Sequence, residues 1–202
     1  MHAATRIDQS EICRGALSVL GSRTLVFVGL MGAGKSVIGR LTAQQLALPF
    51  VDSDSEIERV SRMSVAELFE AYGEPEFRAL ESRVIARLLT AGPRVLSTGG
   101  GAFINGDTRA LIKRDALSVW LKADLETLWE RVNKRDHRPL LKTPEPKKTL
   151  SDLMTKRYPI YEEADIVINS RPVGKDVIVR ETLAAIAALA PAEPTLQAKA
   201  EG

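Results

Sequence analysis

The chain has 202 residues, of which 45% are hydrophobic and 27% are charged, as in a globular protein with one sizeable core. Its formal net charge of +2 is too small to indicate nucleic-acid binding, and no apolar run is long enough to span a bilayer. The single cysteine, Cys13, excludes an internal disulfide and a cysteine-rich zinc site, so we expect a cytoplasmic protein.

Both ends of the chain differ from the middle. Apolar residues recur at helical spacing from Ile12 to Leu20, which predicts a short helix within an N-terminal extension, residues 1–22. Residues 191–202 are rich in Ala, Pro, Glu and Lys and predict a flexible tail. We therefore expect one domain over residues 23–190.

The first strong motif follows the apolar run Thr24–Val28, which predicts a buried strand. Residues 29–36, GLMGAGKS, have the P-loop spacing G-x-x-x-x-G-K-S/T and lead into a helical pattern over 37–46. Its glycines allow the backbone to wrap around an anion at the N-terminus of that helix. Lys35 adds a positive charge for the phosphates, and Ser36 offers a hydroxyl to Mg²⁺. An ordinary glycine-rich turn is the alternative, but the flanking strand and helix favour a nucleoside triphosphate site.

Strands and helices alternate along the rest of the chain. Four further strands are predicted at 49–52, 94–98, 117–121 and 166–168. Helices are predicted at 64–71, 75–90, 107–113, 125–132, 149–164 and 176–189, with capping boxes at Ser55/Glu58 and Ser64/Glu67. Apolar strands separated by helices predict an α/β fold with three layers, α/β/α, around a mainly parallel five-stranded sheet. Ligands of such sheets bind at the carboxyl ends of the strands.

Two carboxylates, Asp52 and Asp54, come at the end of the second predicted strand. If the strand extended through both, they would point the same way into the phosphate site. One could then hold Mg²⁺ through water, while the other accepts a proton from an attacking hydroxyl. Alternatively, the two acids could simply cap the next helix. The third strand ends without an acid, so we expect Asp52 to be a metal ligand together with Ser36.

Three glycines, Gly99 to Gly101, follow the third strand. Consecutive glycines cost backbone entropy and add no packing, which indicates either a ligand lying against the main chain or a plain flexible turn. The sequence leaves both alternatives open.

Three arginines stand at unusual positions. Arg78 lies one helical turn before Glu81, Arg138 lies in a polar, proline-containing segment, and Arg157 directly precedes Tyr158. For each arginine taken alone, a surface ion pair is the favoured interpretation. The segment around Arg138 is either a passive loop or a mobile lid that brings cations onto phosphates.

Taken together, these motifs resemble the shikimate kinase family, whose members are small P-loop phosphotransferases similar in fold to nucleoside monophosphate kinases. The resemblance runs from about Thr24 to Leu189 and rests on GLMGAGKSVIGR, DSD, GEPEFRALE, STGGGA, RPLL and KRYPIYEEAD. It implies a P-loop NTPase fold with a lid at about 133–147 and an acceptor-binding region at about 53–91. It also implies ATP-dependent phosphorylation of the 3-hydroxyl of shikimate by a monomer that uses Mg²⁺.

The resemblance also assigns roles to residues. It implies that Asp54 is the base, that Arg78 and Arg157 bind the shikimate carboxylate, and that Glu81 orients Arg78. The expected substrate-binding residues are Asp54, Phe69, Phe77, Arg78, Glu81, Gly100, Gly101 and Arg157. The expected ATP-binding residues are Gly32, Ala33, Gly34, Lys35, Ser36, Val37, Arg131, Arg138 and Arg171. The expected catalytic residues are Lys35, Asp54 and Arg138, and the expected metal ligands are Ser36 and Asp52.

Two other functions remain open on the sequence. A related small kinase would act on gluconate or on a nucleoside monophosphate. However, a nucleotide acceptor requires a further phosphate pocket, whereas the pairing of D-x-D with E-F-R suits a polyhydroxy acid. The second alternative is a non-catalytic nucleotide-binding module that signals to a partner.

Overall fold

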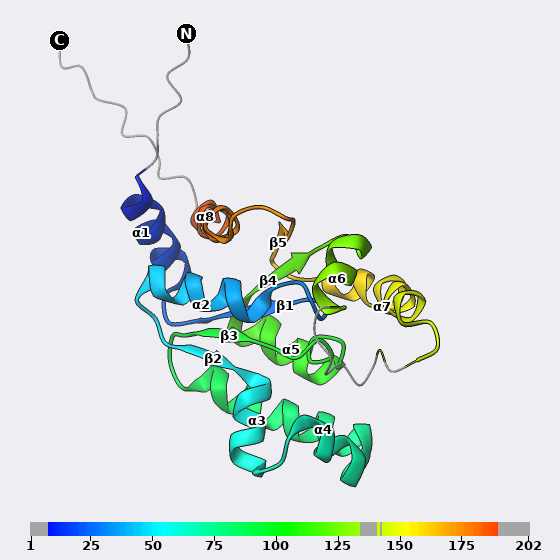
Figure 1. Cartoon of the computed structure of the whole chain (residues 1–202). Helices are drawn as coiled ribbons and strands as arrows, with labels where there is room; N and C mark the ends of the chain where they lie inside the picture. Colours follow the sequence, from blue (N-terminus) through cyan, green and yellow to red (C-terminus); the bar gives the residue numbers. More distant parts are fainter. Residues whose placement is uncertain (1–7, 134–140, 142, 190–202) are drawn as a thin grey trace, which may run out of the picture.

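The computed structural model describes residues 8–133, 141 and 143–189 (Figure 1). The predicted tail, the catalytic candidate Arg138 and most of the predicted lid therefore lie outside the described residues. The strands are β1 (Thr24–Val28), β2 (Phe50–Asp52), β3 (Val95–Ser97), β4 (Ala116–Lys122) and β5 (Ile166–Asn169). The helices are α1 (Gln9–Leu20), α2 (Lys35–Leu46), α3 (Ser53–Ser61), α4 (Val65–Thr90), α5 (Gly106–Asp115), α6 (Leu125–Val132), α7 (Pro146–Tyr161) and α8 (Lys175–Ala187).

All five strands pair in parallel, in the order β2-β3-β1-β4-β5. The central strand β1 is fully buried along its length, as expected for an apolar strand covered on both faces. Helices α2 and α8 pack on one face of the sheet, with α1 beside α8, and α5 packs on the other face (Figure 1). The predicted three-layer α/β fold is confirmed.

Helix α3 begins three residues earlier than its predicted capping box places it. Its N-cap is Asp52, whose side chain accepts a hydrogen bond from the Asp54 main chain. The predicted box at Ser55 is therefore wrong, because Ser55 already lies within the first turn. The second box is confirmed: the Glu67 main-chain N–H donates to Ser64 Oγ, and a Glu67 carboxylate oxygen accepts from the Ser64 main chain.

The two helices predicted at 64–71 and 75–90 are confirmed as the two halves of α4, which is interrupted between them. Gly73 interrupts the helical backbone with a φ of 80°, and Pro75 follows it. This φ lies in the left-handed region that favours glycine, so the kink is fixed by the sequence at this point. The second half of α4 then buries Phe77, Glu81 and Ile85.

The predicted N-terminal helix is confirmed as α1, and it is part of the packed structure. Ala16 and Leu20 are buried, and a Cβ added at Gly15 would lie 3.1 Å from the Ala187 Cβ of α8. The two helix backbones therefore approach each other closely. Among the described residues, no helix combines the length and the hydropathy that a membrane span requires.

Candidate functional site

A cavity of about 490 Å³ lies at the carboxyl ends of the strands. This is where ligands of parallel α/β sheets bind. The predicted site residues that line the cavity are Gly32, Gly34, Lys35, Ser36, Val37, Asp52, Asp54, Gly100, Arg131 and Arg171. The fold thus brings together residues from three predicted motifs, GLMGAGKSVIGR, DSD and STGGGA, with Arg131 and Arg171.

The P-loop forms the start of α2. Gly32 and Gly34 have φ angles of 82° and 98°, in the left-handed region, so their conformations favour glycine. Helix α2 has no side-chain cap, and its N-terminus opens onto the cavity, where main-chain N–H groups can bind an anion. The ammonium group of Lys35 lies inside the loop, because it donates to the carbonyls of Gly29 at 2.8 Å and Leu30 at 3.0 Å.

Two oxygen ligands lie at the base of this loop. Ser36 Oγ donates to Asp52 Oδ2 at 2.7 Å and lies 3.2 Å from Ser97 Oγ. The other oxygen of Asp52 is the cap of α3, so one carboxylate both starts a helix and faces the P-loop. A hydroxyl and a carboxylate beside a phosphate site match the way proteins hold Mg²⁺, which keeps several water and phosphate ligands. The residues present therefore fit the predicted ion.

Asp54 lies in the first turn of α3 rather than at its N-cap, so the capping alternative for Asp54 is wrong. Strand β2 ends at Asp52, so the condition that it extends through both carboxylates is not met. Asp54 nevertheless faces the cavity. Burial raises the pKa of its carboxyl group, the neighbouring Asp52 raises it further, and Lys35 opposes the shift. A carboxylate with a raised pKa is a better proton acceptor than an exposed one.

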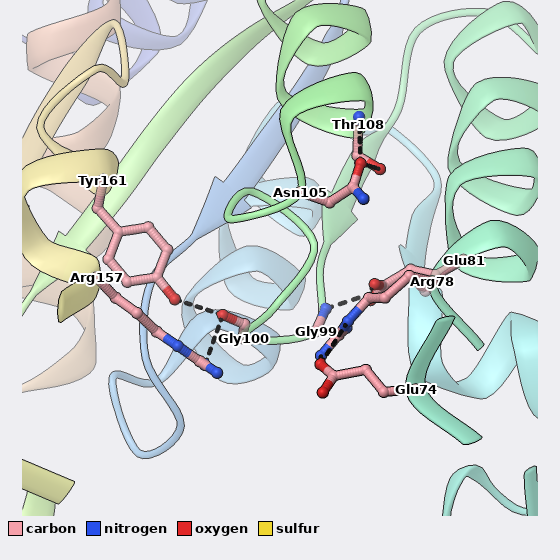
Figure 2. Close-up of polar contacts among 10 residues, drawn as sticks. Glu74, Arg78, Glu81, Gly99, Gly100, Asn105, Thr108, Arg157 and Tyr161 are labelled. Atoms are coloured by element: carbon pink, nitrogen blue, oxygen red, sulfur yellow. Dashed lines mark hydrogen bonds and ion pairs between the residues drawn. The ribbon is translucent and has the colours of Figure 1, made fainter. Parts of the chain in front are cut away.

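Arg78 lies against the glycine turn, where Glu81 holds its guanidinium in place (Figure 2). Arg78 Nη1 donates to Glu81 Oε2 at 2.6 Å, and Arg78 Nη2 lies 3.0 Å from Glu74 Oε1. Glu81 is 1% exposed, and its Oε1 has no hydrogen-bond partner among the described residues. The pKa of Glu81 is raised mainly by burial, while Arg78 lowers it. Glu81 is therefore buried, whereas the Arg78 side chain, packed against the turn, remains 18% exposed.

Phe69 and Phe77 lie beside the same arginine. Their ring centroids are 4.4 Å apart, and the Arg78 guanidinium carbon is 5.7 Å from the Phe69 centroid and 5.1 Å from the Phe77 centroid. The predicted aromatic pair is therefore next to the predicted carboxylate-binding arginine, although neither ring lines the cavity described above.

The glycine turn is close-packed rather than a plain flexible connection. A Cβ added at Gly99 would lie 2.7 Å from Asp54 Oδ1 and 3.0 Å from Glu81 Oε1, and one added at Gly101 would collide with the Arg78 guanidinium. From the opposite side, Arg157 Nη1 donates to the Gly100 carbonyl at 3.1 Å. Figure 2 shows Arg78 and Arg157 on the two sides of this turn.

Arg131 connects the P-loop to the end of the sheet. Its Nη1 donates to Ser170 Oγ at 2.8 Å and to the Gly32 carbonyl at 3.2 Å. Ser170 Oγ in turn donates to the Ala33 carbonyl at 2.7 Å. Arg171 lines the cavity but forms a bidentate ion pair with Glu181. Two of the three predicted nucleotide arginines, Arg131 and Arg171, thus line the same pocket.

Sequence reasoning missed several residues of this cavity. Ser170, Thr98, Lys175 and Ile178 also line it. Thr98 and Ser170 directly follow β3 and β5, so the rule that ligands bind at the carboxyl ends of parallel strands could have found them. No local sequence signal marks Lys175 or Ile178.

Comparisons with known proteins agree on one family. The family model described as "Shikimate kinase" matches residues 31–187. A "Shikimate kinase" of Rhizobium meliloti (strain 1021) is 62% identical over 187 residues, which are 93% of this chain and 97% of the relative. A solved structure of shikimate kinase from Acinetobacter baumannii in complex with shikimate has a TM-score of 0.78 and 33% identity, covering 83% of this chain and 94% of that one. A gluconokinase from Sinorhizobium meliloti 1021 has a TM-score of 0.57 and 21% identity, covering 84% and 94% of the two chains, so it supports the fold alone.

Proposed function

Because the chain belongs to the shikimate kinase family, we propose that it transfers the γ-phosphoryl group of ATP to the 3-hydroxyl of shikimate. The products are shikimate 3-phosphate and ADP, in the biosynthesis of aromatic amino acids. The observation that carries this proposal is the meeting of the P-loop, Asp54 and an arginine-flanked glycine turn at one edge of the sheet. The gluconate alternative is supported by a gluconokinase of 21% identity, which is a likeness of fold alone.

The nucleotide part of the site would neutralise the charge of the phosphates and hold them in position for transfer. The open N-terminus of α2 and Lys35 bind the phosphates, and Arg131 lies beside the bound nucleotide. Arg138 would close over the phosphates from the lid, which lies outside the described residues. Ser36 and Asp52 would hold Mg²⁺, directly or through water. When bound, the ion neutralises charge on the phosphates.

The acceptor part of the site would bind a carboxylate and orient a hydroxyl. Arg78 and Arg157 can donate charge-assisted hydrogen bonds to the carboxylate, together with main-chain N–H groups of Gly100 and Gly101. Asp54 accepts the proton of the attacking hydroxyl while the oxygen forms its bond to the γ-phosphorus and ADP leaves. Phe69 and Phe77 would form an apolar wall of the acceptor pocket. Since one chain supplies each of these groups, we propose a monomer that works in the cytoplasm.

An ADP-release assay with a panel of acceptors tests this proposal. Wild-type protein, Mg²⁺ and ATP are incubated with shikimate, with gluconate, with AMP and without acceptor. We expect ADP release well above the acceptor-free rate with shikimate alone. A preference for gluconate or AMP would replace the proposed acceptor, and equal slow release in every arm would favour a non-catalytic nucleotide-binding module.

Replacing Gly101 with alanine should weaken acceptor binding specifically. The added Cβ would displace the Arg78 guanidinium, which is the far end of a flexible side chain, so the chain should still fold, with some loss of stability from the disturbed pair with Glu81. We expect the KM for shikimate to rise about tenfold, by partial loss of a charge-assisted contact, with an unchanged KM for ATP. Steady-state kinetics with each substrate varied in turn measures both constants.

Gly106→Ala is the matched control for this variant. Nothing lies within 4 Å of a Cβ added at Gly106, and the residue begins helix α5 a few positions further along the chain. It should leave both KM values unchanged. If the two variants behave alike, the close contact between Gly101 and Arg78 has no part in acceptor binding.

A further inference from the structure

Tyr161 is a buried tyrosine at the end of α7, and its hydroxyl donates a hydrogen bond to a main-chain carbonyl. The residue is 0% exposed, and its ring packs among Phe103, Trp120 and Tyr158. A phenylalanine could fill the same apolar space. The hydroxyl, however, donates to the carbonyl of Gly100 in the glycine turn (Figure 2). Burial raises the pKa of Tyr161, which keeps the hydroxyl protonated as a donor.

The same carbonyl accepts a second hydrogen bond, from Arg157 Nη1 at 3.1 Å. A carbonyl oxygen has two lone pairs and can accept both bonds. If Arg157 turns this N–H group toward an acceptor carboxylate, it must give up its bond to Gly100. Without another donor, that step would leave a part-buried carbonyl unpaired, which costs more than an ordinary hydrogen bond gains. The Tyr161 hydroxyl avoids this cost, because its own hydrogen bond keeps the Gly100 carbonyl paired.

The hydroxyl also fixes the direction of the next peptide group. The described residues contain no cis peptide bond, so the Gly100 C=O and the Gly101 N–H point in opposite directions. With the carbonyl directed at α7, the Gly101 N–H is directed away from α7. It donates no hydrogen bond within the described part of the chain and is therefore available to a ligand.

We propose that Tyr161 is a positioning residue for the acceptor: its hydroxyl keeps the Gly100 carbonyl paired, which releases Arg157 to bind the acceptor carboxylate and holds the Gly101 N–H toward the site. This inference rests on the proposed function. Because the hydroxyl acts through the Gly100 carbonyl, its effect should appear in acceptor binding rather than in the chemical step.

The first test compares Tyr161→Phe with Tyr158→Phe. Tyr158 belongs to the same aromatic group, with its ring centroid 4.9 Å from that of Trp120, and its hydroxyl donates to the Ala123 carbonyl outside the glycine turn. Each variant loses one hydroxyl-to-carbonyl bond, so similar decreases in Tm are expected. Tyr161→Phe should raise the KM for shikimate about five- to twentyfold, with kcat and the KM for ATP within about twofold of wild type. Tyr158→Phe should change none of the three constants. Equal shikimate KM values in Tyr161→Phe and wild type, or an equal rise in both variants, would contradict the proposal.

The second test repeats Tyr161→Phe in an Arg157→Ala background. Since the hydroxyl acts largely by releasing Arg157, its removal should raise the KM for shikimate by less than about twofold once Arg157 is absent. If the two effects multiply, the hydroxyl has an independent structural role and the inference is wrong. Shikimate-dependent ADP release by wild type is the separate readout of the proposed function. Its absence would overturn both proposals, whereas its presence with additive variants would overturn only the role of Tyr161.

Discussion

Asp54→Asn is expected to lower kcat for shikimate phosphorylation by about 10²–10⁴-fold while the affinity for ATP stays within about threefold, because the variant loses the proposed proton acceptor but keeps the P-loop. Single-turnover transfer and equilibrium binding of ATP measure the two effects separately. Asp115→Asn is a matched control, since Asp115 is paired with Arg114 on the surface, and it should retain full activity. A nearly fully active Asp54→Asn protein would remove Asp54 from the mechanism.

The pH dependence provides a second measurement of the same group. Burial and Asp52 raise the pKa of Asp54, so wild-type kcat/KM should fall, as the pH is lowered, at a pH above the ordinary range of aspartate. The raised pKa also means that the folded state binds this proton more tightly than the unfolded state. This contribution to stability is present at low pH and is lost as the pH rises through the raised pKa. At pH 8 we therefore expect Asp54→Asn to have a Tm equal to or above that of wild type. If Asp54→Asn had a lower Tm than wild type, its inactivity would be explained by loss of stability rather than by loss of the proton acceptor.

Arg78→Ala is expected to raise the KM for shikimate by about 10- to 100-fold, by losing a charge-assisted contact with the acceptor carboxylate. The KM for ATP should not change, because Arg78 lies on the far side of the glycine turn from Arg157 and does not line the nucleotide cavity. Kinetics at saturating concentrations of the other substrate checks both constants. If the affinity for ATP fell instead, the assignment of Arg78 to the acceptor would be wrong.

The same variant should also lose stability, for a different reason. Arg78 forms an ion pair with the buried Glu81, whose second oxygen is already unpaired among the described residues. Without the guanidinium, the pKa of Glu81 should rise further, because only the lowering influence of Arg78 is removed. Arg87→Ala, on the same helix but paired with Glu56 at the surface, is the control and should alter neither stability nor KM appreciably.

The elements of the fold were largely predictable because their signals are local. Each strand was predicted to within one residue at either end, since apolar runs such as Thr24–Val28 stand between turn residues. The start of α3 was misplaced because Asp52 and Ser55 are both acceptable N-caps, and the end of β2 decides between them. The break between the two helices of α4 was predictable because Gly73 and Pro75 both interrupt a helical pattern, and the backbone is non-helical at Gly73.

The candidate site was predictable where a motif has a fixed spacing. The P-loop and the D-x-D pair both have such a spacing, and the fold brings both to one cavity. Contacts such as Ser170 to Ala33 or Tyr161 to Gly100 join residues 137 and 61 positions apart. Their geometry depends on how strands and helices pack, so a hydroxyl aimed at a distant carbonyl leaves no mark in the sequence.

Helix α1 lies before residue 31, where the match to the family model starts, yet it rests on α8 with Gly15 facing Ala187. The N-terminal end of α8, opposite to Ala187, contributes Lys175 and Ile178 to the wall of the nucleotide cavity. A protein trimmed to begin at Arg23 would expose the apolar side of α8 to water and leave one wall of the ATP pocket without its outer support. The leading residues therefore belong in any preparation intended for ligand soaking or inhibitor screening.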